Sequence, residues 1–235
     1  MNSANSSLPP PEQQEPIRTN LPWPEIDTVF LDLDGTLLDK HFDDHFWENH
    51  LPAVYAVKHR LDALSARKRL LAIYRSVENT LAWTDLDYWS ERLELDVRSE
   101  KRAVSHLIGI HPHAREFLEF LCETGKKPQL ITNAHPHALQ IKLEKIPIGH
   151  LFADIICSQD IGLAKEQPQF WTKLQRRLAY APERTLFVDD TEKVLHAAAS
   201  CGLRHLMHIA KPSSRQPARF SEHYPSIVDF YELLP

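Results

Sequence analysis

The feature that most constrains the fold is a series of short apolar runs, each bounded by polar or acidic residues. The first is Thr28-Val29-Phe30-Leu31, and further runs lie at residues 128–132, 154–158, 185–189 and 204–209. Runs of this kind are typical of strands that are buried on both faces of a sheet. Because segments with helical spacing separate them, the sequence predicts an α/β fold with a parallel sheet and right-handed crossovers.

The connection between the first and second runs is much longer than a simple crossover needs. Residues 40–110 contain helical patterns and no convincing strand. The patterns lie near residues 44–60, 63–79, 86–93 and 99–108. We therefore predict a core made of residues 21–39 and 111–235, with a helical cap domain inserted at 40–110.

Residues 1–20 consist mainly of Ser, Pro, Gln, Glu and Asn. A segment with so little to bury cannot offset the entropy lost on ordering, so we predict a disordered tail. The same stretch lacks the basic start and apolar core of a signal peptide, and no apolar run approaches the length of a membrane span. These observations favour a cytoplasmic protein that does not act at a membrane.

Charge and cysteine content exclude other classes of protein. The 27 Lys and Arg residues against 32 Asp and Glu residues give a formal net charge of −5, which does not favour a nucleic-acid polymer as partner. The three cysteines form no Cys-x-x-Cys pair, so neither a disulfide framework nor a thiolate zinc site is indicated. The His-Pro-His triplets at 111–113 and 135–137 have no Cys or carboxylate beside them, which favours ordinary loop histidines.

Polar side chains gather where the predicted strands end. The first run leads into Asp32 and Asp34, the second into Thr132-Asn133, and the fourth into Asp189-Asp190. The carboxyl ends of parallel strands meet at one edge of a sheet, where ligands of such folds bind. With Lys165 in the loop after the third run, this edge suits a phosphoryl group held by a divalent cation.

Asp32 and Asp34 flank Leu33, so in extended backbone both carboxylates point to one side. One carboxylate would attack phosphorus to form an aspartyl phosphate, and the other would protonate the leaving oxygen. Gly35 would let the chain turn sharply and bring backbone amides close to the phosphoryl oxygens.

A purely structural interpretation exists for each of these residues. Asp32 and Asp34 would terminate a strand, and Thr132 would cap its own. Lys165 would be a solvated charge, while Asp189 and Asp190 would cap a helix that begins near Thr191. The order and spacing of the whole set favour the catalytic interpretation.

The string Asp-x-Asp-Gly-Thr at 32–36 resembles the first motif of the haloacid dehalogenase-like phosphohydrolases. The resemblance implies a Rossmann-like core with helices on both faces, with Asp32 as nucleophile and Asp34 as general acid and base. Thr132 matches the second motif, which binds a phosphoryl oxygen.

The two remaining motifs of that superfamily follow in the family's order. Lys165 matches the third, although Glu166 and Gln167 separate it from Pro168, where the pattern often has Lys-Pro directly. Asp189-Asp190 matches the fourth. The resemblance implies that Mg²⁺ is bound by Asp32, Asp34 and Asp190, with support from Asp189.

From about Trp23 to the C-terminus the chain also resembles bacterial purine 5′-nucleotidases that act on GMP and IMP. The strings that carry this resemblance are Phe46-Trp47, residues 86–91, residues 132–137 and residues 142–144. The resemblance implies hydrolysis of a nucleoside monophosphate beneath the cap. Candidate substrate contacts are then Thr132, Asn133, Lys165, His135, Trp47 and Tyr88. For Trp47 and Tyr88 the alternative is a purely structural role in the cap.

Other functions stay open. A phosphatase for sugar phosphates or phosphoglycolate would carry the same core motifs, and a phosphomutase would also use an aspartyl phosphate. A signalling receiver domain is disfavoured by the order of the acidic motifs, and a non-catalytic scaffold by their completeness. The preferred phosphate ester, the oligomeric state and the role of the tail are not determined by the sequence.

Overall fold

The computed structural model describes residues 21–78 and 80–234, so the tail predicted for residues 1–20 lies outside the described residues. Its centre is a sheet of 6 parallel strands in the order β3-β2-β1-β4-β5-β6. The strands are β1 (Thr28–Leu31), β2 (Lys127–Thr132), β3 (Asp154–Cys157), β4 (Thr185–Asp189), β5 (His205–Ile209) and β6 (Ser226–Ile227). The predicted parallel α/β sheet is confirmed, and the short edge strand β6 was not predicted.

Burial on both faces explains why the strands read as unbroken apolar runs. In β1, Val29 and Leu31 belong to one buried cluster, whereas Phe30 belongs to the cluster on the opposite face. In β4, Val188 joins the first cluster and Phe187 the second. Successive side chains of a strand point to opposite faces of the sheet, so each face needs its own apolar side chains.

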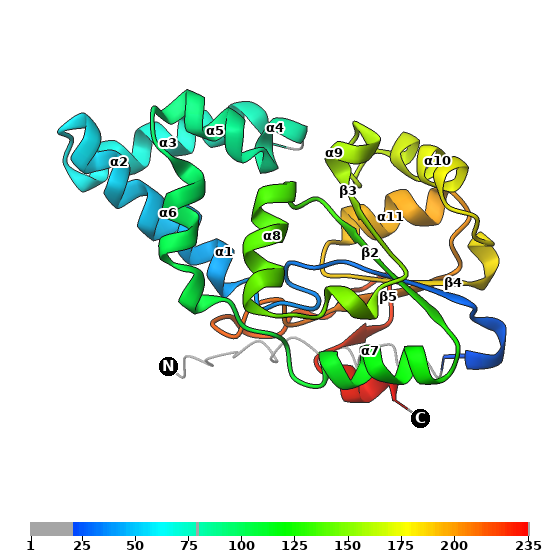
Figure 1. Cartoon of the computed structure of the whole chain (residues 1–235). Helices are drawn as coiled ribbons and strands as arrows, with labels where there is room; N and C mark the ends of the chain where they lie inside the picture. Colours follow the sequence, from blue (N-terminus) through cyan, green and yellow to red (C-terminus); the bar gives the residue numbers. More distant parts are fainter. Residues whose placement is uncertain (1–20, 79, 235) are drawn as a thin grey trace, which may run out of the picture.

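Helices cover both faces of this sheet (Figure 1). Apolar residues of α7 (Ala114–Glu123) and α8 (Pro136–Lys145) join the first cluster. Those of α10 (Pro168–Arg177) and α11 (Glu192–Ser200) join the second, and the short helix α9 (Ser158–Ile161) follows β3 on that side. Single turns of 3₁₀ helix lie at Trp23–Glu25, Gly149–Leu151, Pro182–Arg184 and Phe230–Leu233.

The segment between β1 and β2 is helical, as expected. It contains α1 (His41–His45), a π-helical turn η2 (Phe46–His50), α2 (Leu51–His59), α3 (Ala63–Val77), α4 (Leu81–Thr84), α5 (Leu86–Leu93), α6 (Val97–Ala103) and a 3₁₀ turn η3 (Ser105–Leu107). None of its described residues lies in a strand, although Ile110 forms an isolated bridge with Leu38. These helices lie to one side of the sheet, with α8 between them and the strands in this view (Figure 1).

Two of these helices begin earlier than their sequence patterns indicate. The Asp39 carboxylate accepts a hydrogen bond from the backbone N–H of His41, which starts α1. Asp96 accepts one from the backbone N–H of Ser99, so α6 begins at Val97.

Phe42 and Phe46 of the insert share a buried cluster with the strands. The domain boundaries at residues 40 and 110 stay a prediction.

Two further findings bear on the expected setting of the protein. Within the described residues, no helix is long and apolar enough to cross a membrane. Cys122, Cys157 and Cys201 are all free thiols.

Candidate active site

Lys165 is the centre of charge at the carboxyl edge of the sheet. Its Nζ lies 2.5 Å from Oδ1 of Asp32, 2.7 Å from Oδ2 of Asp189 and 3.1 Å from the carbonyl oxygen of Ile131. Burial alone would lower the pKa of Lys165, but the two carboxylates outweigh that effect and raise it. Lys165 is therefore a permanent cation that connects the ends of β1 and β4.

The loop after β3 holds Lys165 in place through its backbone. The indole N–H of Trp171 donates to the Lys165 carbonyl over 2.9 Å, and the backbone N–H of Lys165 donates to Oδ1 of Asn133 over 3.0 Å. Asn133 in turn donates to the Glu166 carboxylate. Trp171 is fully buried and packs against Phe187 of β4. The separation of Lys165 from Pro168 therefore does not displace the lysine from the acids.

The loops that follow β1 and β4 bring Asp34 and Asp190 to the same edge. Gly35 has φ +91°, and a Cβ atom on it would lie 2.6 Å from Oδ2 of Asp190, so only glycine fits. Burial, followed by repulsion from Asp189 and Asp32, raises the pKa of Asp190 well above its usual value. An excess of buried carboxylates over nearby cations is the environment in which a divalent cation is stabilised.

Thr132 ends β2 beside these acids and is fully buried. Its Oγ1 accepts a hydrogen bond of 2.9 Å from the backbone N–H of Ala134. The hydroxyl hydrogen is thus left to donate, as contact with a phosphoryl oxygen would require. His135 also lines the cavity described next, and its predicted contact with substrate stays a prediction.

A cavity of about 620 Å³ joins this edge to the helical insert. Its floor includes Asp32, Asp34, Thr132, Asn133, Lys165, Asp189 and Asp190. Its opposite side includes three aromatic side chains, Trp47, Tyr74 and Trp83. Tyr88 is not among the lining residues; its ring packs edge-on against Trp89, with centroids 5.1 Å apart. A substrate contact by Tyr88 therefore stays a prediction.

The π-helical turn η2 anchors Trp47 in this wall. The backbone N–H of Leu51 donates to the Phe46 carbonyl, which leaves the Trp47 carbonyl free to accept a bond of 3.2 Å from the Tyr74 hydroxyl. Pro52 has no N–H, and the Glu48 carbonyl accepts a bond of 3.1 Å from Arg67 of α3 instead. Turns of this kind occur often at functional sites.

Comparison with known proteins decides the family. The sequence model of the haloacid dehalogenase-like hydrolase family matches residues 26–202 of this chain. The chain is a haloacid dehalogenase-like hydrolase. It is 35% identical over 216 residues to the GMP/IMP nucleotidase YrfG of Escherichia coli (strain K12), a match that covers 92% of this chain and 97% of that protein.

Two more distant relatives agree with this assignment. A phosphoglycolate phosphatase of Pseudomonas putida is 25% identical over 75% of this chain and 66% of its own length. The crystal structure of a HAD phosphatase from Thermococcus onnurineus superposes with a TM-score of 0.73 at 23% identity, over 88% of this chain and 96% of that one. The latter supports the fold predicted from the sequence.

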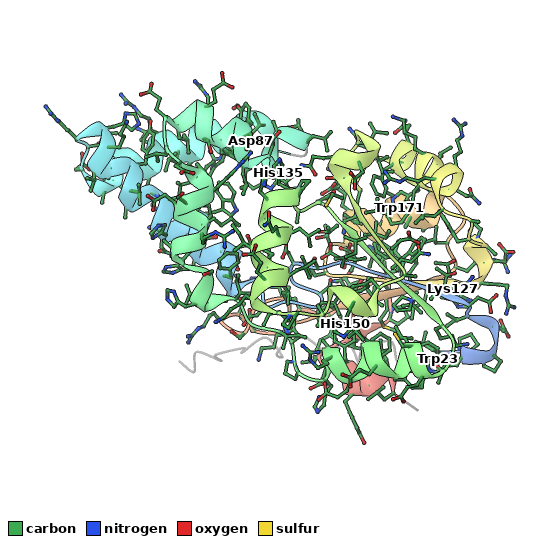
Figure 2. The ribbon with its side chains drawn as sticks, viewed as in Figure 1. Trp23, Asp87, Lys127, His135, His150 and Trp171 are labelled. Carbon is green, nitrogen blue, oxygen red and sulfur yellow. The ribbon has the colours of Figure 1, made fainter. Side chains whose placement is uncertain are left out.

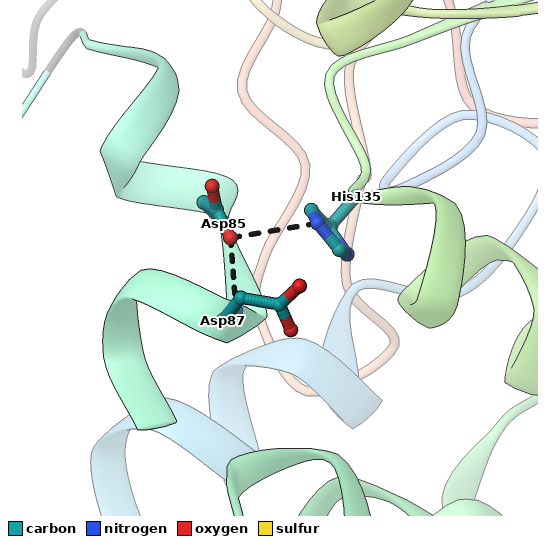
Figure 3. A group of neighbouring side chains, drawn as sticks. All are labelled: Asp85, Asp87 and His135. Atoms are coloured by element: carbon teal, nitrogen blue, oxygen red, sulfur yellow. Dashed lines mark hydrogen bonds and ion pairs between the residues drawn. The ribbon is translucent and has the colours of Figure 1, made fainter. Parts of the chain in front are cut away.

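Among the described residues of this hydrolase, another group of side chains has spacing compatible with a metal ion. Ligand atoms of Asp85, Asp87 and His135 lie within 4.8 Å of one another (Figure 3). The Asp85 carboxylate, however, already caps α5 by accepting from the backbone N–H groups of Asp87 and Tyr88. Asp87 pairs with Arg98, so we assign no ion to this group.

The same group connects the insert to α8. Nε2 of His135 lies 3.4 Å from Oδ1 of Asp85, and its Nδ1 accepts from the backbone N–H of His137. The labelled side chains of Asp87 and His135 are near one another in Figure 2, on α5 and at the start of α8. No carboxylate neighbours His135 in the sequence. The contact with Asp85 forms only when α5 packs beside α8, so the sequence alone did not predict it.

Sequence reasoning also missed a set of buried charges beside Asp34. Lys142 of α8 and Lys101 of α6 are both about 1% exposed, and both contact the carboxylate of Asp43. Lys142 in addition lies 2.6 Å from Oδ1 of Asp34. A lysine at a helical spacing reads as a solvated charge. Lys142 belongs to a string that resembles purine nucleotidases, but nothing in the sequence indicated that it or Lys101 is buried in an ion pair.

Proposed function

We propose that this hydrolase is a magnesium-dependent phosphatase that acts through an aspartyl phosphate on Asp32, with GMP and IMP as preferred substrates and the cytoplasm as its setting. The observation that carries the proposal is the cavity, which is lined both by the carboxylates of the sheet edge and by aromatic side chains of the helical insert. Its volume of about 620 Å³ is in the range of sites that enclose a molecule of nucleotide size.

In the first step, a carboxylate oxygen of Asp32 attacks phosphorus, and the bond between phosphorus and the 5′-oxygen breaks. Asp34 gives its proton to that oxygen, so the nucleoside leaves as a neutral alcohol. In the second step, Asp34 takes a proton from water as the water oxygen attacks phosphorus. Inorganic phosphate leaves and the Asp32 carboxylate is restored.

Burial raises the pKa of both Asp32 and Asp34 to about 6, against the opposing effect of Lys165 and Lys142. For Asp34, a pKa raised by burial favours the protonated form that a general acid needs. Lys165 holds Asp32 in position, and the Thr132 hydroxyl donates to a phosphoryl oxygen.

The acids at the sheet edge also fit a magnesium ion. Asp32 and Asp190 would hold the ion with their carboxylates. Asp34 would contribute its main-chain oxygen, because its carboxyl group carries the transferred proton, and Asp189 would support the ion through Lys165 and the loop after β4. When bound, magnesium supplies positive charge that offsets the crowded carboxylates and the phosphate dianion.

The aromatic wall suits a purine base. Trp47, Tyr74 and Trp83 line the cavity, and stacking of a base on an aromatic side chain would contribute about 1–3 kcal/mol. The ring centroid of Tyr74 lies 5.9 Å from that of Trp47 and 5.8 Å from that of Trp83, so the three form one continuous surface. A sugar phosphate or phosphoglycolate would leave this surface empty.

Arg75 and Glu78 supply polar groups on the same side of the cavity. Within residues 21–78 and 80–234, neither side chain has a hydrogen-bond or ion-pair partner. Guanine and hypoxanthine both present an oxygen at C6 and an N–H at N1. Arg75 would donate to that oxygen and Glu78 would accept from that N–H, whereas adenine reverses both groups and leaves them unpaired.

A substrate panel tests the proposal. The purified protein is given GMP, IMP, AMP, pyrimidine nucleotides, sugar phosphates and phosphoglycolate, with and without magnesium, and phosphate release is measured. We expect GMP and IMP to have the highest kcat/KM and chelator to abolish turnover. A higher kcat/KM for phosphoglycolate or a sugar phosphate than for every nucleotide would contradict the specificity, and full activity in excess chelator would contradict the metal.

A further inference from the structure

Three charged residues from different parts of the chain meet behind Asp34. Lys142 Nζ donates to Oδ2 of Asp43 over 2.7 Å, and Lys101 Nζ donates to Oδ1 of Asp43 over 2.5 Å. Asp43 belongs to α1, Lys101 to α6 and Lys142 to α8. We call Lys142, Asp43 and Lys101 the charge relay, which joins α1 and α6 of the insert to α8.

The relay ends on Asp34. Lys142 Nζ lies 2.6 Å from Oδ1 of Asp34. Among the described residues, no donor reaches that oxygen in hydrogen-bonding geometry, so the Lys142 ammonium is its ion-pair partner. Asp34 itself is half-buried and lines the cavity.

Stability alone does not account for this arrangement. A buried lysine is costly unless it is paired, and apolar residues of similar volume often serve a buried site as well or better. The ring of Phe46 partly compensates the buried charge of Lys101, because its centroid lies 4.4 Å from Nζ of Lys101. Asp43 alone would pair both lysines, so the contact of Lys142 with a cavity carboxylate needs another explanation.

We infer that Lys142 is a positioning residue for Asp34, and that Asp43 holds Lys142 in place for this purpose. The ammonium fixes one carboxylate oxygen of Asp34, so that the other is presented to the leaving oxygen of the substrate. The inference rests on the proposed role of Asp34 as general acid. It assigns to Lys142 no contact with the substrate.

The role predicts a dependence on the leaving group. The leaving group of p-nitrophenyl phosphate is p-nitrophenolate, which departs without protonation. The 5′-oxygen of a nucleotide needs a proton to leave. Lys142→Met should therefore lower kcat for GMP by about tenfold to a hundredfold and kcat for p-nitrophenyl phosphate by only a few fold. Lys142 lines the cavity, but a pure positioning role requires no contact with the substrate, so KM should change little.

Lys101→Met is the matched control. Each of the two substitutions removes one buried ammonium and leaves Asp43 with the other. Lys101→Met should keep the wild-type ratio of kcat between the two esters, since Asp43 still holds Lys142. An equal change of that ratio in both variants would show a general packing effect and overturn the inference.

A double-mutant cycle with Asp34→Asn gives the decisive measurement. If Lys142 acts through Asp34, the loss caused by Lys142→Met disappears in the Asp34→Asn background. Losses that multiply would mean that Lys142 acts on the substrate directly, and the positioning role would be wrong. If Lys142→Met does not fold by circular dichroism, Asp43→Asn replaces it in the same cycle with the same expected result.

The cycle also separates the two proposals. An equal loss for both esters in Asp34→Asn alone would contradict the role of Asp34 as general acid. A loss in Asp34→Asn that depends on the leaving group, combined with losses that multiply in the double variant, would contradict only the role of Lys142.

Discussion

The ammonium of Lys142, in the second half of α8, lies 2.6 Å from Oδ1 of Asp34 in the loop that follows β1. Lys142 also contacts Asp43 of α1, so one side chain connects the catalytic edge of the sheet to the helical insert. The position of the insert and the orientation of Asp34 are therefore linked through a buried contact.

Asp32→Asn should abolish turnover, because an amide cannot form an acyl phosphate. We expect kcat to fall at least about a thousandfold while the variant stays folded. Mass spectrometry of acid-quenched enzyme should detect a phosphorylated form of the wild type and none of the variant. Asp27→Asn is the control, since Asp27 pairs with Arg184 outside the cavity and should keep normal turnover. Normal phosphate release by Asp32→Asn would exclude Asp32 as the nucleophile.

Gly35→Ala should impair magnesium binding, because its Cβ would lie 2.6 Å from Oδ2 of Asp190 and force that carboxylate to move. The magnesium concentration for half-maximal activity should rise about tenfold or more, and stability should fall by roughly 1–3 kcal/mol. Gly125→Ala is matched, since Gly125 also has a positive φ (+72°) but no atom within 4 Å of the added Cβ. Gly125→Ala should lower the stability and leave the magnesium requirement unchanged. An equal magnesium requirement in both variants would contradict the placement of the ion.

Arg75→Ala should lower kcat/KM for GMP and IMP by about tenfold or more and leave kcat/KM for AMP nearly unchanged. Glu78→Gln should act in the same direction, since an amide accepts less strongly from the N1–H of the base. Arg69→Ala is the control, because Arg69 is exposed on the same helix and does not line the cavity. An equal loss for GMP and AMP in Arg75→Ala would exclude recognition of the base by Arg75.

His135 should make the folded state sensitive to mild acid. Burial lowers the pKa of His135, against the opposing effect of Asp85 and Asp87, so the unfolded chain binds its proton more readily than the folded one. The stability from the neutral imidazole is thus present above the unfolded pKa of about 6.5 and is lost as pH falls through the folded value. His135→Asn keeps a capping side chain for α8 and removes the titration.

Thermal unfolding from pH 7.5 to pH 5 measures this effect. The wild type should lose more Tm over that range than His135→Asn does. His150→Asn is the control, because His150 lies in the 3₁₀ turn after α8 and does not line the cavity. Parallel pH profiles for the wild type and His135→Asn would contradict the contribution of His135 to the acid sensitivity.

The strands and the polar residues at the carboxyl edge of the sheet were accessible from the sequence. Val29 to Leu31 read as a strand buried on both faces, because each face of the sheet needs its own apolar side chains. In a parallel sheet, the residues that follow the strands must meet at one edge. That rule brings Asp32, Thr132 and Asp189 together without knowledge of side-chain packing.

The contacts that connect the insert to this edge were decided only by the tertiary structure. Lys142 meets Asp34 and Asp43, and His135 meets Asp85, because helices from distant parts of the chain pack at particular angles and depths. Helical periodicity indicates which face of a helix is buried but not which distant residue that face will meet. A lysine in such a pattern has the same sequence signature in solvent as in a buried ion pair, so only the packed molecule distinguishes the two.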